Sequence, residues 1–238
     1  MSLAFAVPSL ALWHEELWDT ILDLSALLDE GSWVLVGGQA VVAHALSHEA
    51  DETRTPRDID PIGRLVTTAT ALPTVLTTLR HLGFDPEGSQ PPRAGLFRYR
   101  REAEGNDACD LPQTWTIHAV GVTSWHGGDQ ALARRVPHQA TKGLRAPWVP
   151  VPDLLSTIVY EASQFATDTI DPFVHARHTA FLVSLIDDPA GERSRLTPTD
   201  RRALRVLDAA VGERGHHVWA ELPSDRDTFT RWRLLLAL

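Results

Sequence analysis

The sequence predicts a mixed α/β (α+β) protein, with a sheet domain at residues 1–125 followed by a helical domain at residues 126–238. In the first half, short apolar runs alternate with segments of helical period, which is typical of strands and helices that build one sheet domain. After residue 147 the apolar residues recur at helical spacing alone. The chain has 238 residues, 43% of them hydrophobic, which is enough to bury the core of one large or two small domains.

The predicted elements of the sheet domain follow one another at short intervals. Apolar residues at helical spacing predict a first helix over residues 13–30. A buried strand at residues 33–36 stops at Gly37 and Gly38, and the apolar positions of residues 39–46 predict a helix packed on that strand. Strand, glycine turn and helix therefore succeed one another. The remaining elements expected in this domain are a helix at residues 72–82 and strands at residues 96–100 and 115–122.

Capping signals predict the helices of the second domain. Asp153 follows a proline and precedes an apolar run, and Thr197 begins a segment with a proline and an acid in its first turn. We expect helices over residues 153–167, 171–188, from residue 197 onward, and 224–238.

The charge distribution limits the classes of partner. The formal net charge is −9, which argues against a nucleic-acid binder that acts through bulk attraction. A local exception is the segment at residues 131–147, which has no acid and carries the cations Arg134, Arg135, Lys142 and Arg145. We interpret this segment as a basic loop that is either solvated or turned toward phosphate or RNA.

Two further features bear on the compartment. No apolar run reaches the roughly 18 uncharged residues that a membrane span requires, and the N-terminus lacks the basic region of a signal peptide. The single cysteine, Cys109, has no internal disulfide partner. We therefore expect a cytoplasmic protein without a membrane partner.

The segment Arg57-Asp58-Ile59-Asp60 carries the strongest chemical signal. On a strand, alternate side chains share a face, so Asp58 and Asp60 point together. Two such carboxylates suit Mg²⁺, and the glycine turn at Gly37 and Gly38 offers backbone N–H groups and a helix N-terminus to a triphosphate. Their order along the chain indicates nucleotidyl transfer, in which metal ions steady the attacking and leaving oxygens.

Two stretches of this sequence resemble a known family. They are Val36-Gly37-Gly38-Gln39-Ala40-Val41-Val42-Ala43-His44-Ala45-Leu46 and Arg54-Thr55-Pro56-Arg57-Asp58-Ile59-Asp60. They resemble the signature of the AbiEii and MenT nucleotidyltransferases, which belong to the polymerase-beta-like superfamily. The resemblance implies a minimal polymerase-beta sheet domain with a helical C-terminal domain, and weaker similarity continues through much of the chain.

The resemblance also implies an activity and its residues. The expected enzyme transfers a nucleotide from an NTP to an RNA (tRNA-like) or protein acceptor, often as a toxin with a cognate antitoxin. Asp58 and Asp60 would be catalytic and would hold the metal, which is Mg²⁺ or Mn²⁺, with Zn²⁺ as a further option. The predicted nucleotide-binding residues are Gly37, Gly38, Arg57, Arg98, His175 and Arg177.

The sequence departs from the family pattern at three positions. His118 stands where the family has a third catalytic carboxylate, Glu161 where it has a phosphate-contacting lysine, and His178 where it has an acid. A neutral imidazole is a poor Mg²⁺ ligand and adds no negative charge. Asp107 and Asp110 are candidate substitutes for the missing carboxylate.

Two interpretations of these departures remain open. In the first, the site is retuned, and His118, His175 or His178 joins the aspartates around a softer metal. In the second, the site has decayed into a module that binds a nucleotide, RNA or protein. Phosphoryl transfer depends on positioning and electrostatics, so lost charges lower its rate steeply.

Overall fold

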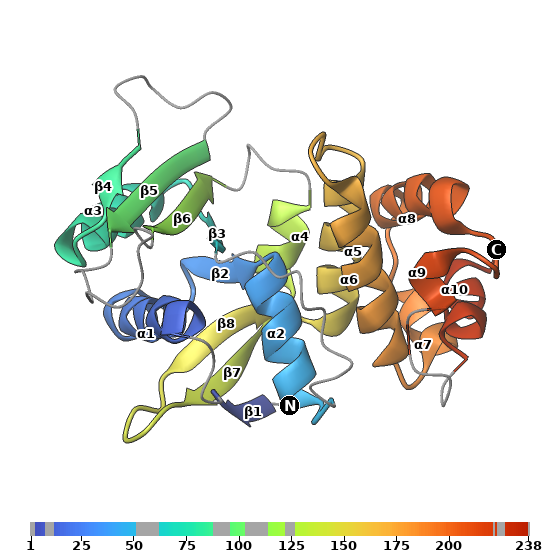
Figure 1. Ribbon diagram of the computed structural model, residues 1–238, viewed down its shortest axis with the longest axis horizontal. Helices are drawn as coiled ribbons and strands as arrows, with labels where there is room; N and C mark the ends of the chain where they lie inside the picture. The colour runs from blue at the N-terminus through green and yellow to red at the C-terminus, as the bar shows by residue number, and fades with distance from the viewer. Residues whose placement is uncertain are drawn as a thin grey trace.

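The computed structural model describes residues 3–7, 12–50, 62–87, 96–102, 114–121, 127–220, 222 and 227–237. Its strands are β1 (Leu3–Ala6), β2 (Trp33–Val36), β3 (Ile62–Thr67), β4 (Asp85–Pro86), β5 (Leu96–Glu102), β6 (Thr114–Gly121), β7 (Arg135–Thr141) and β8 (Trp148–Pro152). Its helices are α1 (Leu12–Leu27), α2 (Gly38–Ser47), α3 (Leu72–His81), α4 (Gly128–Ala133), α5 (Leu154–Phe165), α6 (Pro172–Ser184), α7 (Pro189–Ser194), α8 (Pro198–Val211), α9 (His217–Ala220) and α10 (Thr228–Leu236). The sheets lie on one side of Figure 1 and α5–α10 on the other, which confirms the predicted fold class.

A five-stranded mixed sheet forms the first half of the molecule, in the order β2-β3-β6-β5-β4. Strand β3 is parallel to β6 and antiparallel to β2, and β5 is antiparallel to both of its neighbours. The crossover between β3 and β6 includes α3, as a parallel pair requires a long connection. Residue 36 of β2 lies opposite residue 64 of β3, which lies opposite residue 118 of β6, so these residues share one face.

A second, three-stranded sheet has the order β1-β7-β8. The sequence analysis was wrong to expect a basic loop at residues 131–147 and helices alone afterwards, because α4, β7 and β8 lie there. The sequence did not indicate these strands because they contain prolines, and a proline cannot donate a hydrogen bond to a strand ladder. In the structure Pro137 stands opposite Pro150, and the described pairing of β7 with β1 starts one residue later, at His138.

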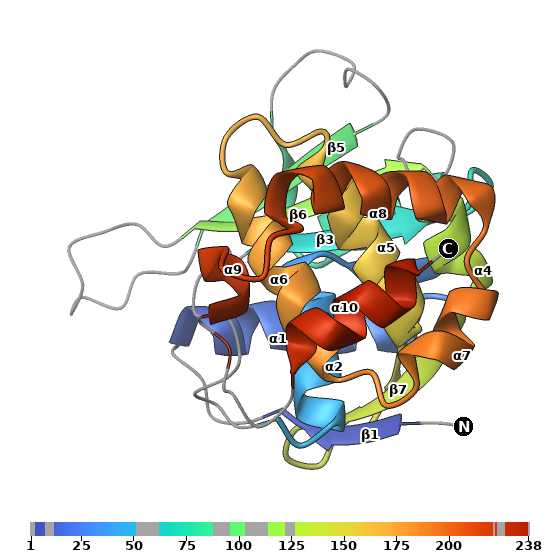
Figure 2. The same cartoon turned by 90° about the vertical axis from the view of Figure 1, so that its right-hand side faces the viewer.

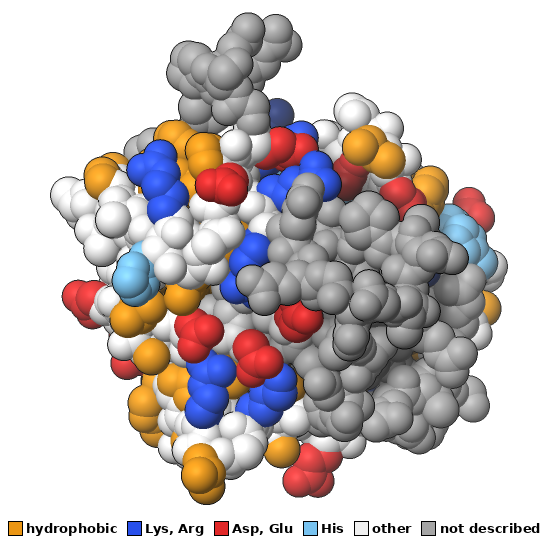
Figure 3. Space-filling model, turned by 60° about the vertical axis from the view of Figure 1, so that its left-hand side comes forward, with side chains coloured by type: hydrophobic (Ala, Val, Ile, Leu, Met, Phe, Trp, Pro, Cys, Tyr) orange, Lys and Arg blue, Asp and Glu red, His pale blue; other side chains and the backbone are white. Residues whose placement is uncertain are grey.

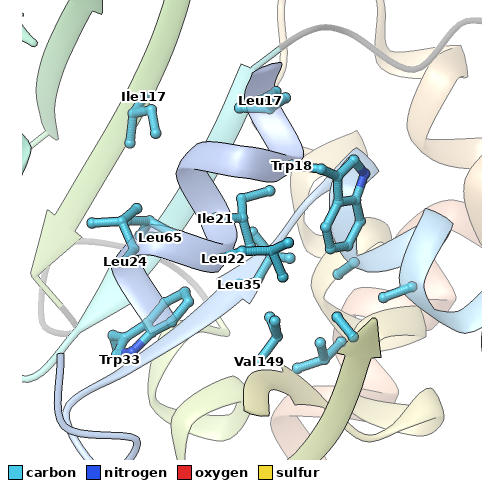
Figure 4. Close-up of a cluster of buried hydrophobic side chains, with 14 of the residues drawn as sticks. Leu17, Trp18, Ile21, Leu22, Leu24, Trp33, Leu35, Leu65, Ile117 and Val149 are labelled. Carbon is cyan, nitrogen blue, oxygen red and sulfur yellow. The ribbon is translucent and has the colours of Figure 1, made fainter. Parts of the chain in front are cut away.

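Helix α1 and α3 cover one face of the five-stranded sheet. Leu17, Ile21 and Leu24 recur on the buried side of α1, as their spacing predicts, and none of them is exposed. They pack with Trp33 of β2, and Figure 4 shows this cluster continuing to Val149 of β8. The cluster therefore joins the two sheets through α1.

The opposite face of the sheet turns toward the helical half. Val34, Val36 and Val66 pack there against Leu132 of α4 and Tyr160 of α5. Behind α5 and α6 lies the helical core, which α8 and α10 close from outside, as Figure 2 shows. Thr197 caps α8 as predicted and forms a capping box with Asp200, and Asp153 accepts from Ser156 N at the start of α5, so these two predicted helix starts are confirmed.

A buried histidine links α2 to the helical half. His44 Nε2 lies 3.0 Å from the carbonyl oxygen of Pro152 and 3.0 Å from Thr157 Oγ1. Burial, with smaller contributions from His138 and His48, lowers the pKa of His44 to about 3. The ring is therefore neutral and fixes α2 against the start of α5.

None of the helices in the described part of the chain has both the length and the apolar character needed to cross a lipid bilayer.

Candidate functional site at the junction of sheet and helices

The glycine turn predicted after β2 is present. Gly37 has φ 70° and ψ −155°, a conformation that is essentially restricted to glycine, and α2 begins at Gly38. A Cβ atom at Gly37 would lie 3.1 Å from Cδ of Arg64. The backbone of this turn therefore comes close to an arginine, at a helix end whose N–H groups suit an anion.

Arg64 belongs to a row of three polar residues across the sheet. Arg64 on β3 lies opposite His118 on β6, and His118 lies opposite Arg98 on β5. All three share a face with Val36, which turns toward α4 and α5. We call Arg64, His118 and Arg98 the arginine–histidine row.

The middle residue of this row is a neutral imidazole. His118 is buried, and burial together with the charges of Arg64 and Arg98 lowers its pKa to about 4. At neutral pH the ring therefore carries no charge, while both neighbouring arginines are cationic. Such a row attracts an anion and does not replace a carboxylate at a Mg²⁺ site.

Arg64 connects the row to α5. Its side chain is half-buried and hydrogen-bonds the hydroxyl of Tyr160. Burial raises the pKa of Tyr160, against the opposing effect of the Arg64 charge, so the phenol stays protonated. Tyr160 precedes Glu161, which begins a second group of titratable side chains.

This second group consists of Glu161 on α5 with His175 and His178 on α6, and we call it the Glu-His-His cluster. Glu161 Oε2 lies 2.7 Å from His175 Nδ1 and 3.1 Å from His178 Nδ1. The other ring nitrogen of His175 lies 3.1 Å from Asp168 Oδ2. The carboxylate of Glu161 is fully buried and both imidazoles are nearly so.

The pKa shifts in this cluster favour an ion pair when no metal is bound. Burial by itself would raise the pKa of Glu161, but the hydrogen bonds from His175 and His178 outweigh it and the pKa is lowered. Burial would likewise lower the pKa of His175, yet Glu161 and Asp168 raise it. A protonated His175 can therefore donate to both carboxylates at once.

Two of the three departures from the family pattern meet in this cluster. The resemblance puts a lysine at position 161 and an acid at position 178, and here Glu161 and His178 are in contact. Glu161 thus places a carboxylate where the resembled family has a lysine, and His178 places an imidazole where it has an acid. The sequence could not show this contact, because the positions lie on different helices.

The other predicted residues are only partly described. Arg177 on α6 lies 3.5 Å from Asp171, and Arg98 is exposed on β5. The following predicted residues lie outside the described part of the chain: Arg57, Asp58, Asp60, Asp107 and Asp110.

Three residues of the site escaped the sequence analysis: Arg64, Tyr160 and Asp168. For Arg64 a signal existed, since the alternation that groups Asp58 with Asp60 reaches position 64 along the sequence. Tyr160 and Asp168 gave no comparable signal. Their roles depend on contacts between α5, α6 and the sheet.

Three of the four cations of residues 131–147 are paired with acids, and the fourth, Arg135, donates to the carbonyl oxygen of Leu132. Lys142 and Arg145 contact Asp19 on α1, and Arg145 also contacts Asp23. Arg134 reaches Asp200 on α8. On the face drawn in Figure 3, positive and negative side chains likewise alternate and form no single basic patch. This segment therefore holds elements together through its charges.

A groove of about 410 Å³ lies between α4, α5 and α8. Among the described residues, none of those predicted for catalysis or nucleotide binding lines it. Gly37, Gly38, Arg98, His118, His175 and Arg177 lie elsewhere, at the start of α2, on the sheet and on α6.

Comparison with models of known protein families finds no match, and comparison with curated proteins finds no significant relative. The nucleotidyltransferase resemblance thus rests on the motifs quoted above and stays a prediction.

Proposed function

We propose that this protein is an NTP-binding nucleotidyltransferase that transfers a nucleotide to an RNA (tRNA-like) or protein acceptor. The observation that carries the proposal is the glycine turn at Gly37, which lies beside Arg64 of the arginine–histidine row. Turn and row together present N–H groups and two guanidinium groups, which is the donor set that a triphosphate requires.

Each group has a distinct task in this proposal. The α2 N-terminus and Arg98 hold phosphate oxygens. His118 is neutral, so it adds no negative charge that would repel these oxygens. The acceptor oxygen forms a bond to the α-phosphorus, the bond to the bridging oxygen breaks, and pyrophosphate leaves. The acceptor proton passes to a carboxylate, for which Asp58 and Asp60 are the candidates.

A divalent metal, Mg²⁺ or Mn²⁺, would be held by Asp58 and Asp60 and would neutralise phosphate charge when bound. His118 does not fit such a site as a third ligand, because it is neutral and lies between two cations. Asp58 and Asp60 are thus the only protein ligands for this metal in the proposal. The proposal also includes a cytoplasmic location, where Cys109 stays reduced, and a role as a toxin with a cognate antitoxin.

A second candidate is a catalytically degenerate module that binds a nucleotide, RNA or protein. The neutral His118 favours it, because the position at which the resembled family has a carboxylate carries no negative charge. This module would retain the anion site and lack the transfer step.

One set of measurements separates the two candidates. Each NTP is titrated calorimetrically with Mg²⁺, Mn²⁺ or Zn²⁺ into the wild type, Arg98→Ala and the Asp58→Ala, Asp60→Ala double variant. NTPs labelled at the α-phosphate are then incubated with total RNA and protein. Arg205→Ala is the control, since it removes an exposed arginine from α8.

The enzyme predicts binding that Arg98→Ala weakens, and label transfer that the double variant abolishes. Binding without transfer under every metal would support the module instead. No NTP binding by the wild type under any metal would contradict the enzyme and leave only a module that binds RNA or protein. Equal losses in Arg98→Ala and Arg205→Ala would contradict an anion site at the arginine–histidine row.

A further inference from the structure

The helical half contains a group of side chains with metal-binding chemistry that the proposed function does not use. Among the residues that the structure describes, Glu161, His175 and His178 are the only group of three or more that offers ligand atoms to one ion. These ligand atoms all lie within 4.8 Å of one another. His118 lies on β6 and is outside this group.

The local sequence explains how the three side chains converge. His175 and His178 are separated by three positions on α6, which places them on the same side of the helix. Glu161 faces them from α5, which packs along α6. The ligands therefore come from two rigid helices, and their geometry does not depend on a loop.

The distances are close to those of a loaded site. Zn²⁺ binds imidazole nitrogen at about 2.0–2.1 Å and carboxylate oxygen at about 2.0–2.2 Å, so tetrahedral neighbours lie about 3.3 Å apart. In the structure Glu161 Oε2 is 2.7 Å and 3.1 Å from the Nδ1 atoms of His175 and His178. Small side-chain movements would thus replace the hydrogen-bonded protons by an ion.

Burial leaves two polar atoms of the cluster without partners. Among the described residues nothing hydrogen-bonds Glu161 Oε1 or His178 Nε2, and both atoms are buried. A His175 imidazolium would satisfy one oxygen of Glu161 and would leave these two atoms as they are. A bound cation would offset the cost of burying the Glu161 carboxylate, whose Oε1 otherwise lacks a partner.

Asp168 provides the support that metal-binding histidines usually have. Its Oδ2 lies 3.1 Å from His175 Nε2, and its Oδ1 accepts from the backbone N–H of Ile170 at 2.8 Å. A carboxylate that accepts from the outer nitrogen of a ligating histidine fixes the ring and its tautomer. The side chain of Asp168 is 24% exposed, so the cluster is within reach of solvent at this point.

We infer that Glu161, His175 and His178 bind one divalent transition-metal ion of the zinc class, with Asp168 as the positioning residue. Two imidazoles and one carboxylate suit Zn²⁺ and not Mg²⁺ or Ca²⁺, which take oxygen ligands. Three protein ligands leave one coordination position for water or another small ligand. The inference does not rest on the proposed metal at Asp58 and Asp60 or on nucleotide transfer.

The experiment measures metal binding and makes no use of activity. Protein stripped with a chelator is titrated with Zn²⁺ by calorimetry and with Co²⁺, whose visible absorption reports tetrahedral nitrogen and oxygen ligands. The variants are Glu161→Gln, His178→Asn and Asp168→Asn. The matched controls are the His216→Asn, His217→Asn double variant, which removes an adjacent histidine pair with ring centroids 4.3 Å apart, and Asp58→Ala, Asp60→Ala.

The expected result is one Zn²⁺ per chain and a tetrahedral Co²⁺ spectrum. Glu161→Gln and His178→Asn lose the spectrum, and Asp168→Asn weakens Zn²⁺ binding about 10–100-fold. Both control variants keep the stoichiometry and the spectrum. Far-UV circular dichroism checks folding. If a ligand variant does not fold, the Zn²⁺ affinities of Asp168→Asn and of the two controls decide whether the cluster binds the metal.

Three results would overturn the inference. The wild type could fail to bind Zn²⁺ at micromolar concentration, which would leave an ion pair only. Binding could persist at full strength in Glu161→Gln and Asp168→Asn. It could also disappear in the His216→Asn, His217→Asn variant, which would assign it to the other histidine pair.

Discussion

The arginine–histidine row on the sheet and the Glu-His-His cluster on the helices differ in how their charges are compensated. In the row, two cations flank a neutral imidazole, and no acidic side chain in the described part of the chain forms an ion pair with either arginine. In the cluster, a buried carboxylate is matched by imidazoles within hydrogen-bonding distance. The row therefore has charge available for an external anion, whereas the cluster balances its own charge or holds a cation.

The difference follows from burial. Exposed Arg98 keeps water around its charge, so it needs no internal partner. Glu161 is fully buried, and an isolated carboxylate there would cost several kcal/mol. A charge on the open face of a sheet can thus serve a ligand, while a charge between two helices must first be compensated. Five measurements test this comparison.

The largest expected effect concerns the cluster. Glu161→Ala in the presence of a chelator should lower the free energy of unfolding by about 3–5 kcal/mol, because it leaves a buried His175 without its main counter-charge. Denaturant unfolding measures the loss. The control, Asp171→Ala, removes the partly exposed partner of Arg177 and should cost less than about 1 kcal/mol. Similar losses in the two variants would contradict the comparison.

The next effect concerns His118 and the pH. Its pKa is about 4 in the folded protein and 6.5 without the fold, so the unfolded chain takes up the proton first as the pH falls. The contribution of His118 to stability is therefore complete above pH 6.5 and declines down to about pH 4. At pH 5 the loss amounts to about 2 kcal/mol. Unfolding of the wild type and of His118→Asn at several pH values measures it. The comparison is needed because His44, with a pKa of about 3, adds its own loss over the same range.

The same residue reports on the row by NMR. Since the charges of Arg64 and Arg98 help to lower the pKa of His118, pyrophosphate bound at the row should raise it, and so should Arg98→Ala. Imidazole nitrogen shifts give the titration. A His118 pKa that neither change moves would show that burial alone sets it and that the anion does not bind at the row.

A smaller loss in the free energy of unfolding is expected at the glycine turn. Gly37→Ala places an L side chain at φ 70°, which costs about 1–2 kcal/mol, and brings a Cβ to 3.1 Å from Arg64. Gly143→Ala is a matched control, because Gly143 has φ 58° and no atom within 4 Å of its Cβ position. The loss at Gly37 should be the larger one, because it combines a backbone conformation restricted to glycine with the contact with Arg64. Equal losses and unchanged NTP binding would count against a close approach at Gly37.

The smallest effect concerns the basic segment. Arg145→Ala removes two partly exposed ion pairs with α1 and should lower the free energy of unfolding by less than about 1 kcal/mol. RNA binding by this variant should match that of the wild type. A clear loss of RNA affinity would revive the RNA-facing interpretation of residues 131–147.

Local patterns predicted most of the regular elements. The spacing in α1, the apolar run of β2, the glycine turn and the capping box of α8 each depend on neighbouring residues, and the structure contains all of them. The strand pair β7 and β8 could not be predicted in this way, because its prolines are tolerated only through the register of a second sheet. The same holds for the Glu-His-His cluster, whose members are 14 and 17 positions apart.

The contact between His44 and the start of α5 has a consequence for how the chain can be divided. His44 lies before residue 125, and both of its partners, Pro152 and Thr157, lie after it. Val41 and Ala45 of α2 likewise belong to the helical core. A fragment cut at residue 125 would expose these apolar side chains and leave His44 unpartnered, so the two halves fold as one cooperative unit and recombinant fragments should retain both.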